Sequence, residues 1–294
     1  MSKVLSNKKM IALLVLPGII IFCLVILVPI FMSVFYSVTD YNGIDAMKFV
    51  GLTNYKKLIM DDKIMWLSIR NVFILSAGLI IIQHPLSIVC AIYVDKAGGV
   101  WEKIFRVLIF IPSMTSVVVT AKLWMNMLDP TFGLVNKILK AVGLTSWCQA
   151  WMTETTTALI AIVLIEIWVG FGWSMLIYYA GVKGIPSDQI DAARIDGAAD
   201  GHLITKIILP QLKPIIRINI TLAIVNALKM METVYLTTNG APGNTTQFVA
   251  NYLYVKAFSD QKYGYANAIS VVFIVICLIA NFITKQITAE RGEK

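Results

Sequence analysis

Residues that commonly carry out chemistry are few and scattered in this chain. No CxxC pair, no set of side chains with metal-ligand spacing and no Ser/His/Asp arrangement can be picked out. The chain also has no GxxxxGK[ST] segment, which would hold nucleotide phosphates. We therefore expect no catalytic residue, no metal and no cofactor on this polypeptide, so that any ATP and Mg would have to be held by a partner. The histidines and cysteines are isolated: His84, His202, Cys23, Cys90, Cys148 and Cys277.

Three charged residues deserve more notice because they lie inside long apolar runs: Glu166, Lys229 and Glu232. Charges in a hydrocarbon environment are costly and often functional. Lys229 and Glu232 are three residues apart, so on one helix they would share a face and could pair. Two interpretations stay open. The charges either form an ion pair that only holds helices together, or they line a polar route through the protein.

The elements that must position these charges are membrane-spanning helices. The chain of 294 residues is 58% hydrophobic and 14% charged, with a mean hydropathy of +0.76. Soluble domains of this size are about 25% charged. Continuous apolar runs of about 20 residues indicate helices, since the backbone must satisfy its own hydrogen bonds in lipid. The sequence predicts an all-α membrane protein with an N-terminal segment 1–10 and spans at about 11–38, 69–94, 104–127, 158–182, 215–238 and 267–287.

The distribution of Lys and Arg predicts the orientation. These residues are more frequent in the N-terminus and the even-numbered connections than in the others, although the long connection 39–68 opposes the trend. We therefore expect both termini on the cytoplasmic side. The net charge of +8 is then a property of cytoplasmic loops and needs no nucleic acid.

The connection 183–214 carries the most specific pattern. Pro186 followed by Ser187 and Asp188 is a helix-start signal, and Gly201 could end that helix. The small residues of the expected helix would let another surface approach closely. Two prolines, Pro210 and Pro214, precede the fifth span. The spaced elements are Asp191-Ala192-Ala193, Asp196-Gly197-Ala198 and Ile207-Ile208-Leu209-Pro210, with Pro214 beyond.

This pattern resembles the EAA loop of permease subunits in bacterial ABC importers, with Asp191 in place of the usual Glu. The resemblance extends over nearly the whole chain and is strongest to the carbohydrate branch, the group of the maltose and glycerol-phosphate permeases, in which the chain is most similar to the first permease of a pair. Other segments that carry it are Phe49–Leu52, Asn54-Tyr55, Arg106–Pro112, Leu236–Pro242 and Tyr263–Ala266.

The resemblance implies a type I importer fold in a bacterial plasma membrane and several partners. These are a second homologous permease, two ATP-binding cassette ATPases and an extracytoplasmic binding protein. It implies that a cytoplasmic coupling helix docks on an ATPase. The residues expected to serve this coupling are Asp191, Ala192, Ala193, Asp196, Gly197, Ala198, Leu209 and Pro210.

The same resemblance places sugar contacts in the fourth and fifth spans. Sugars need polar groups for hydroxyls and aromatic faces for the apolar sides of their rings. Only Gly170 keeps the residue type of the maltose-type permease, so the resemblance implies location rather than chemistry. With the intramembrane charges added, the expected substrate-path residues are Glu166, Gly170, Trp173, Asn226, Lys229, Met230 and Glu232.

Alternative functions stay open at this point. Within the same architecture, the substrate could be a sugar phosphate, a uronic-acid oligomer or a polyol. From another class, the chain could be a channel or secondary transporter that works without an ATPase, in which case the loop 183–214 would have no partner. A membrane enzyme would need a catalytic cluster, which the sequence does not offer.

Overall fold

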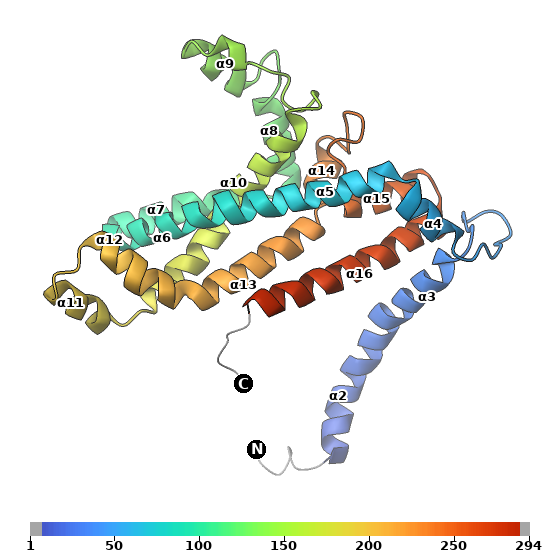
Figure 1. Cartoon of the computed structure of the whole chain (residues 1–294), viewed down its shortest axis with the longest axis horizontal. Coiled ribbons are helices and arrows are strands. Elements are labelled where there is room, and N and C mark those ends of the chain that lie inside the picture. Colours follow the sequence, from blue (N-terminus) through green and yellow to red (C-terminus); the bar gives the residue numbers. More distant parts are fainter. Residues whose placement is uncertain (1–7, 289–294) are drawn as a thin grey trace. The chain divides into compact units, whose positions relative to one another are not determined.

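The structure, a computed structural model, describes residues 8–288, and almost all of its regular structure is helical (Figure 1). Within that range, the β-structure consists of one isolated bridge between Thr39 and Phe49. Five helices are long and apolar enough to cross a membrane, and a bent pair supplies a sixth candidate. The predicted all-α membrane fold is therefore confirmed. The five are Lys9–Ser37, Lys63–Ala97, Ala158–Lys183, Asp200–Leu228 and Tyr263–Thr284.

The described chain divides into two compact units. The first comprises residues up to 62 together with 253–276. It contains α2 (Lys8–Phe22), η1 (Cys23–Leu27), α3 (Val28–Ser37), α4 (Thr53–Met60), η5 (Val255–Ser259) and the first half of α16 (Tyr263–Thr288).

Two residues from the segments that resemble the importer family, Asn54 and Gly264, have structural roles in this first unit. Asn54 of α4 donates to the carbonyl oxygens of Ser37 and Thr39 at 2.9 and 2.8 Å. A Cβ on Gly264 would lie 2.1 Å from the Thr39 carbonyl oxygen, so only glycine permits this close approach. The Gly264 N–H donates to the carbonyl oxygen of Tyr41 at 2.8 Å. These contacts fix the segment after α3 against the start of α16.

The second unit comprises residues 63–252 and the end of α16, from Cys277. Its helix α10 (Ala158–Lys183) packs against α6 (His84–Ala97), α7 (Gly99–Met114) and α13 (Leu209–Leu228). The buried face of α10 includes Ile162, Ile165 and Tyr178. Gly172 lets α7 come close, because a Cβ there would lie 2.3 Å from the Ile109 carbonyl oxygen. The remaining elements are α5 (Lys63–Gly78), η2 (Leu79–Gln83), α8 (Val117–Met127), α9 (Leu134–Ala141), η3 (Thr145–Trp147), α11 (Ser187–Ile195), α12 (Asp200–Leu203), η4 (Ile204–Ile208), α14 (Glu232–Leu236) and α15 (Val249–Tyr254).

Three spans accommodate an internal proline by the same device. A π-helical turn, η1, η2 or η4, directly precedes each Xaa-Pro pair. The residue before proline, Val28, His84 or Leu209, donates its N–H to the carbonyl five residues back rather than four. Proline lacks an N–H and its ring crowds the carbonyl four residues back, so a wider turn relieves both problems.

Two spans differ from their predicted limits. The expected span 104–127 is broken into α7 and α8, which are bent by 94° relative to each other. The expected span 215–238 instead begins at Asp200, runs through Pro210 and Pro214, and ends at Leu228. A separate short helix, α14, follows. The prolines that suggested a helix boundary are thus inside the helix, because η4 absorbs the first of them.

Candidate functional site

The loop 183–214 contains a short helix with a well-defined end. Asp191, Ala192 and Ala193 lie in α11, whose C-cap is Asp196. Gly197 has a φ of +81°, a left-handed conformation that favours glycine. Its N–H donates to the Arg194 carbonyl at 3.0 Å, and the Ala198 N–H donates to the Ala193 carbonyl at 2.9 Å. This pair of bonds is a Schellman motif. The expected end at Gly201 therefore moves back to Ile195, and Gly201 lies within the next helix, α12.

Two contacts attach α11 to the spans. Ile190 packs against a core cluster that includes Ile185, Ile208 and Leu212. Gln211 of α13 donates to the Gln189 side chain at 2.6 Å. The expected coupling residues Leu209 and Pro210 lie at the start of α13, directly after η4. These contacts join α11 to the end of α10 and to α13.

The rest of α11 faces outward. Ile195 is 86% exposed, an unusual state for a large apolar side chain. Ala192 and Asp196 are exposed as well, and Asp191 pairs with Arg194 at 3.8 Å, both side chains being exposed. Such an exposed ion pair adds little stability. This combination of small residues, one apolar residue and acidic groups suits contact with another protein.

A group of polar contacts near this loop joins four helices. Lys183 at the end of α10 lies 2.7 Å from Asp95 of α6 and 3.4 Å from Glu102 of α7. Tyr179 donates to Glu102, and Lys96 lies 2.9 Å from Asp200 of α12. Sequence reasoning did not identify this network, since it is assembled from residues far apart in the chain.

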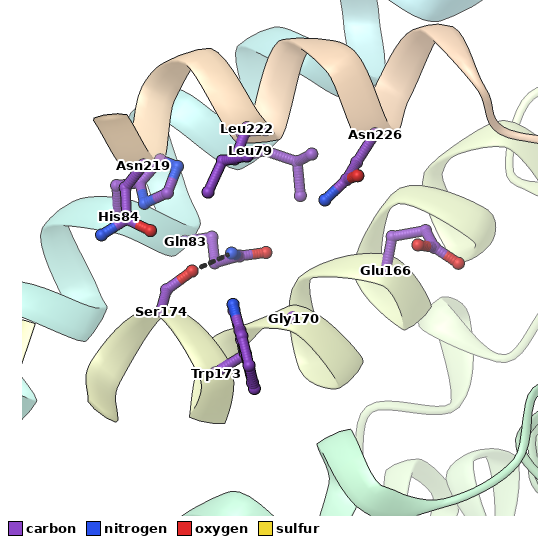
Figure 2. Close-up of a pocket in the computed structure, with 11 residues that line it drawn as sticks. Leu79, Gln83, His84, Glu166, Gly170, Trp173, Ser174, Asn219, Leu222 and Asn226 are labelled. Atoms are coloured by element: carbon purple, nitrogen blue, oxygen red, sulfur yellow. Dashed lines mark hydrogen bonds between the residues drawn. The ribbon is translucent and has the colours of Figure 1, made fainter. Parts of the chain in front are cut away.

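A cavity of about 280 Å³ is lined by η2 and α6 of the second span, by α10 and by α13 (Figure 2). Four expected substrate-path residues line it: Glu166, Gly170, Trp173 and Asn226. The structure thus brings residues of α10 and α13, the fourth and fifth spans, together in one cavity. The other lining residues are Leu79, Gln83, His84, Ser174, Asn219, Leu222 and Ala223.

Three other expected path residues lie outside this cavity. Lys229 is the C-cap of α13, and the backbone leaves the helical conformation at Met231 before α14 begins at Glu232. Lys229 and Glu232 therefore do not share the helix face on which the expected pairing depended. Lys229 lines a second cavity of about 190 Å³, together with residues of α13 and the end of α16. Met230 is buried, with 8% of its surface exposed.

Glu166 has a defined partner. The Thr233 hydroxyl of α14 donates to Glu166 Oε1 at 2.6 Å. This bond fixes one carboxyl oxygen. Trp173 is 57% exposed, and one face of its ring stacks on Phe110 with centroids 6.2 Å apart. An acceptor and an aromatic surface are thus available along the same helix, α10.

Sequence reasoning missed Gln83, His84, Ser174 and Asn219. Gln83 donates to the Ser174 hydroxyl at 2.8 Å, and Tyr178 shares a hydrogen bond of 3.0 Å with His84 Nδ1. A signal was present, because Gln83-His84 is a polar pair inside an apolar run of the second span.

Comparison with known proteins gives a consistent result. Residues 84–290 match the family of the binding-protein-dependent transport system inner membrane component. The probable ABC transporter permease protein PH1215 of Pyrococcus horikoshii is 33% identical over 92% of this chain and 92% of its own length. The diacetylchitobiose uptake system permease protein NgcF of Streptomyces coelicolor is 28% identical over 88% of this chain and 76% of its own length.

The fold comparison agrees. A crystal structure of a bacterial alginate ABC transporter, in complex with an alginate pentasaccharide-bound periplasmic protein, contains a similar chain. The TM-score is 0.82 at 23% identity, over 97% of each chain. The type I importer permease fold expected from the loop is therefore confirmed. Members of this family are multi-pass transport subunits that act with binding-protein and ATPase partners, and ATP hydrolysis belongs to the latter. The chain belongs to the family of binding-protein-dependent transport system inner membrane components and is the permease subunit of an ABC importer.

Proposed function

We propose that this permease forms half of a translocation path for a sugar or oligosaccharide delivered by an extracytoplasmic binding protein. The observation that carries the proposal is the cavity lined by Glu166, Gly170, Trp173 and Asn226, the positions that the maltose-type resemblance implies. The relative NgcF is described as part of a diacetylchitobiose uptake system, and the similar transporter structure handles alginate. Both names point to a saccharide.

The proposed assembly has two permeases and two ATPases. The second permease is a homologue that supplies the other half of the path. Both termini lie in the cytoplasm, which places α11 on the ATPase side. The terminal residues 1–7 and 289–294 lie outside the described part of the chain, so the orientation rests on the loop and on the distribution of Lys and Arg.

Coupling is proposed to act through α11. ATP binding brings the two ATPases together. The helix α11 is seated on one of them and moves with that subunit. Ile190 and the Gln189–Gln211 bond carry that movement to α10 and α13, which line the cavity. The cavity opens toward the binding protein, and ATP hydrolysis resets the cycle. Asp191 and Ala192 contact the ATPase, while Gly197 gives α11 its required end.

The cavity offers both kinds of group that a sugar needs. Glu166 and Asn226 provide acceptors and a donor for hydroxyls, and the exposed ring of Trp173 provides a flat apolar surface. Lys229 and Glu232, outside the cavity, are proposed to lie farther along the path. Met230 is proposed to support the end of α13 from its buried position.

The test compares Glu166→Gln with Glu232→Gln in the assembled transporter. Both variants remove one carboxylate, but only Glu166 lines the cavity. We expect Glu166→Gln to raise the half-saturating sugar concentration in uptake roughly two- to tenfold, equivalent to one hydrogen bond of about 0.5–1.5 kcal/mol. Glu232→Gln should change it less. An unchanged half-saturating concentration in the Glu166→Gln transporter would remove the cavity from the path.

A further inference from the structure

Three buried polar atoms in the cavity have no hydrogen-bond partner. They are Gln83 Oε1, His84 Nε2 and Asn219 Nδ2. Their residues are 4%, 3% and 3% exposed, and all three line the cavity. A buried polar group without a partner costs about 1–3 kcal/mol, so three in one place call for an occupant that can bond to them. We call Gln83, His84 and Asn219 the Gln83 subsite.

The surrounding contacts hold these groups in place. The Gln83 amide nitrogen donates to Ser174, and Figure 2 shows the amide oxygen turned away from that bond. Whichever way the amide is assigned, one of its two polar atoms is left for a ligand. Gly170 makes room for the amide, since a Cβ there would lie 2.8 Å from Gln83 Oε1.

The other two members are held by Tyr178. Its hydroxyl bonds to His84 Nδ1 at 3.0 Å, which leaves Nε2 available. The Asn219 side chain lies next to the same hydroxyl, and its Nδ2 has no partner with hydrogen-bond geometry. The subsite therefore offers one fixed acceptor or donor from each of three residues, two on the second span and one on α13.

The size and charge of the cavity indicate the chemistry of its occupant. Its volume of about 280 Å³ is several times the roughly 30 Å³ of a water molecule. Among the described residues that line it, Glu166 is the only acid and none is Lys or Arg. A carboxylated sugar would bring a negative charge into the cavity beside Glu166 without a cation to balance it.

We propose that the Gln83 subsite binds hydroxyl or amide groups of one ring of an uncharged sugar, and that neutral oligosaccharides rather than uronic-acid oligomers are the substrates. The proposal rests on the proposed function, because it assumes that the cavity belongs to the sugar path. It adds the second span and residues Gln83, His84 and Asn219 to that path. Leu79 and Leu222, which also line the cavity, would face the apolar side of the ring.

The first experiment identifies the substrate class. The assembled transporter, with its binding protein, is reconstituted in lipid nanodiscs, and its ATPase rate is measured with two probes. One is a pool of neutral oligosaccharides from hydrolysed starch, arabinan, xylan and chitin; the other is a pool of uronic-acid oligosaccharides from hydrolysed alginate and polygalacturonate. Stimulation by the neutral pool alone is expected. Stimulation by the uronic pool overturns this inference but leaves the proposed function standing, whereas no stimulation by either overturns both.

The second experiment locates the contact, with the active neutral pool as probe. Gln83→Met and Asn219→Leu keep side-chain size but lose the polar atoms. We expect each to raise the half-stimulating concentration about two- to tenfold, as the loss of one uncharged hydrogen bond implies. Ser87→Ala is the matched control, because Ser87 is buried on α6 and donates to the Phe171 carbonyl of α10 at 3.2 Å without lining the cavity. The proposal fails if Ser87→Ala shifts the concentration as much as Gln83→Met, or if neither subsite variant shifts it.

Discussion

The helices α9 and α11 end in the same way but are held differently. Gly143 after α9 has a φ of +82°, and Gly197 after α11 has a φ of +81°. The Gly143 and Leu144 N–H groups donate to the carbonyls of Lys140 and Leu139 at 3.1 and 2.8 Å, the same pattern of bonds that closes α11. At neither glycine would a Cβ meet an atom within 4 Å.

The difference lies in what surrounds each helix. Asn136 of α9 is 4% exposed and bonds to Pro130, Gln149 and Trp151. The described contacts of α11 to the spans are the packing of Ile190 and one exposed side-chain bond, and its outward face includes Ile195. The comparison teaches that the glycine of the coupling motif is required by the helix end itself. Whether Gly197 also contacts a partner must therefore be tested by making the same substitution at Gly143, which ends α9 in the same way.

The largest expected effect comes from a bulky residue at either glycine. Gly197→Trp and Gly143→Trp impose the same backbone strain, and each Trp projects into open space within this chain. Only at position 197 do we expect an ATPase surface to occupy that space. Sugar uptake by the assembled transporter should fall tenfold or more for Gly197→Trp, with ATP hydrolysis continuing, and much less for Gly143→Trp. Similar uptake by both variants would show that α11 is no more a docking element than α9.

The next effect concerns the anchoring of α9. Asn136→Ala removes the side-chain amide that donates to the Pro130 and Gln149 carbonyls. It also removes the acceptor of the Trp151 indole N–H. We expect this to destabilise the region by about 2–3 kcal/mol, because buried polar groups lose their partners. Gln211→Ala, which cuts the exposed bond to α11, should cost under about 1 kcal/mol. Each loss is measured as the change in proteolysis rate, under native conditions, at the segment around α9 for Asn136→Ala and at the loop 183–214 for Gln211→Ala. An equal increase in rate for the two variants would contradict the difference in how α9 and α11 are anchored.

A smaller effect should separate backbone strain from side-chain bulk. Gly197→Ala places a Cβ on a left-handed residue, which costs about 1 kcal/mol, whereas asparagine tolerates this conformation better. We expect the amide protons of Gly197 and Ala198 to exchange faster in Gly197→Ala than in Gly197→Asn. At the end of α9, the amide protons of residues 143 and 144 should likewise exchange faster in Gly143→Ala than in Gly143→Asn, since the two helix ends share one geometry. A difference between the two sites in this ranking would show that the ends are not equivalent.

The smallest effect is a pH response confined to the approach to α9. The Thr131 hydroxyl and the Phe132 N–H donate to Asp129 Oδ1, and these bonds hold the pKa of the Asp129 carboxyl below its usual value of 3.8. A lowered pKa means that the bonds contribute stability above pH 3.8, which is lost as the pH falls through the folded-state pKa. The amide resonances of Thr131 and Phe132 should therefore move only as the pH falls below 3.8, and Asp129→Asn should abolish the movement. A movement centred above pH 4 would contradict the assignment.

The sequence predicted the loop better than the cavity, for a physical reason. The helix α11 depends on local signals, Ser187 after Pro186 at its start and Gly197 at its end, which are read within one short segment. The cavity depends on residues from three spans, and its second-span members lie in or directly after a π-helical turn that shifts the helical period. A regular period could not show that Gln83 would meet Ser174.

The same limit applies to the fifth span. Pro210 and Pro214 locally favour a helix start, so the predicted boundary was placed after them. The wide turn at Ile204–Ile208 lets the helix continue through the first proline, an adjustment that depends on the packing of Ile208 and Leu212 in the core. The break after Leu228 was equally hidden, because residues 229–236 remain mostly apolar.

The 94° break between α7 and α8 has a consequence for solvation. The 16 residues of α7 rise about 24 Å, which is less than the roughly 30 Å of hydrocarbon in a bilayer. We therefore expect the chain to change direction within the depth of the lipid tails. The Ser116 side chain accepts from the Val119 N–H, but the first turn of any helix presents further N–H groups that need acceptors. Lipid cannot provide them. We therefore expect the break to be wetted or covered by protein, with Thr115 and Ser116 turned away from the acyl chains.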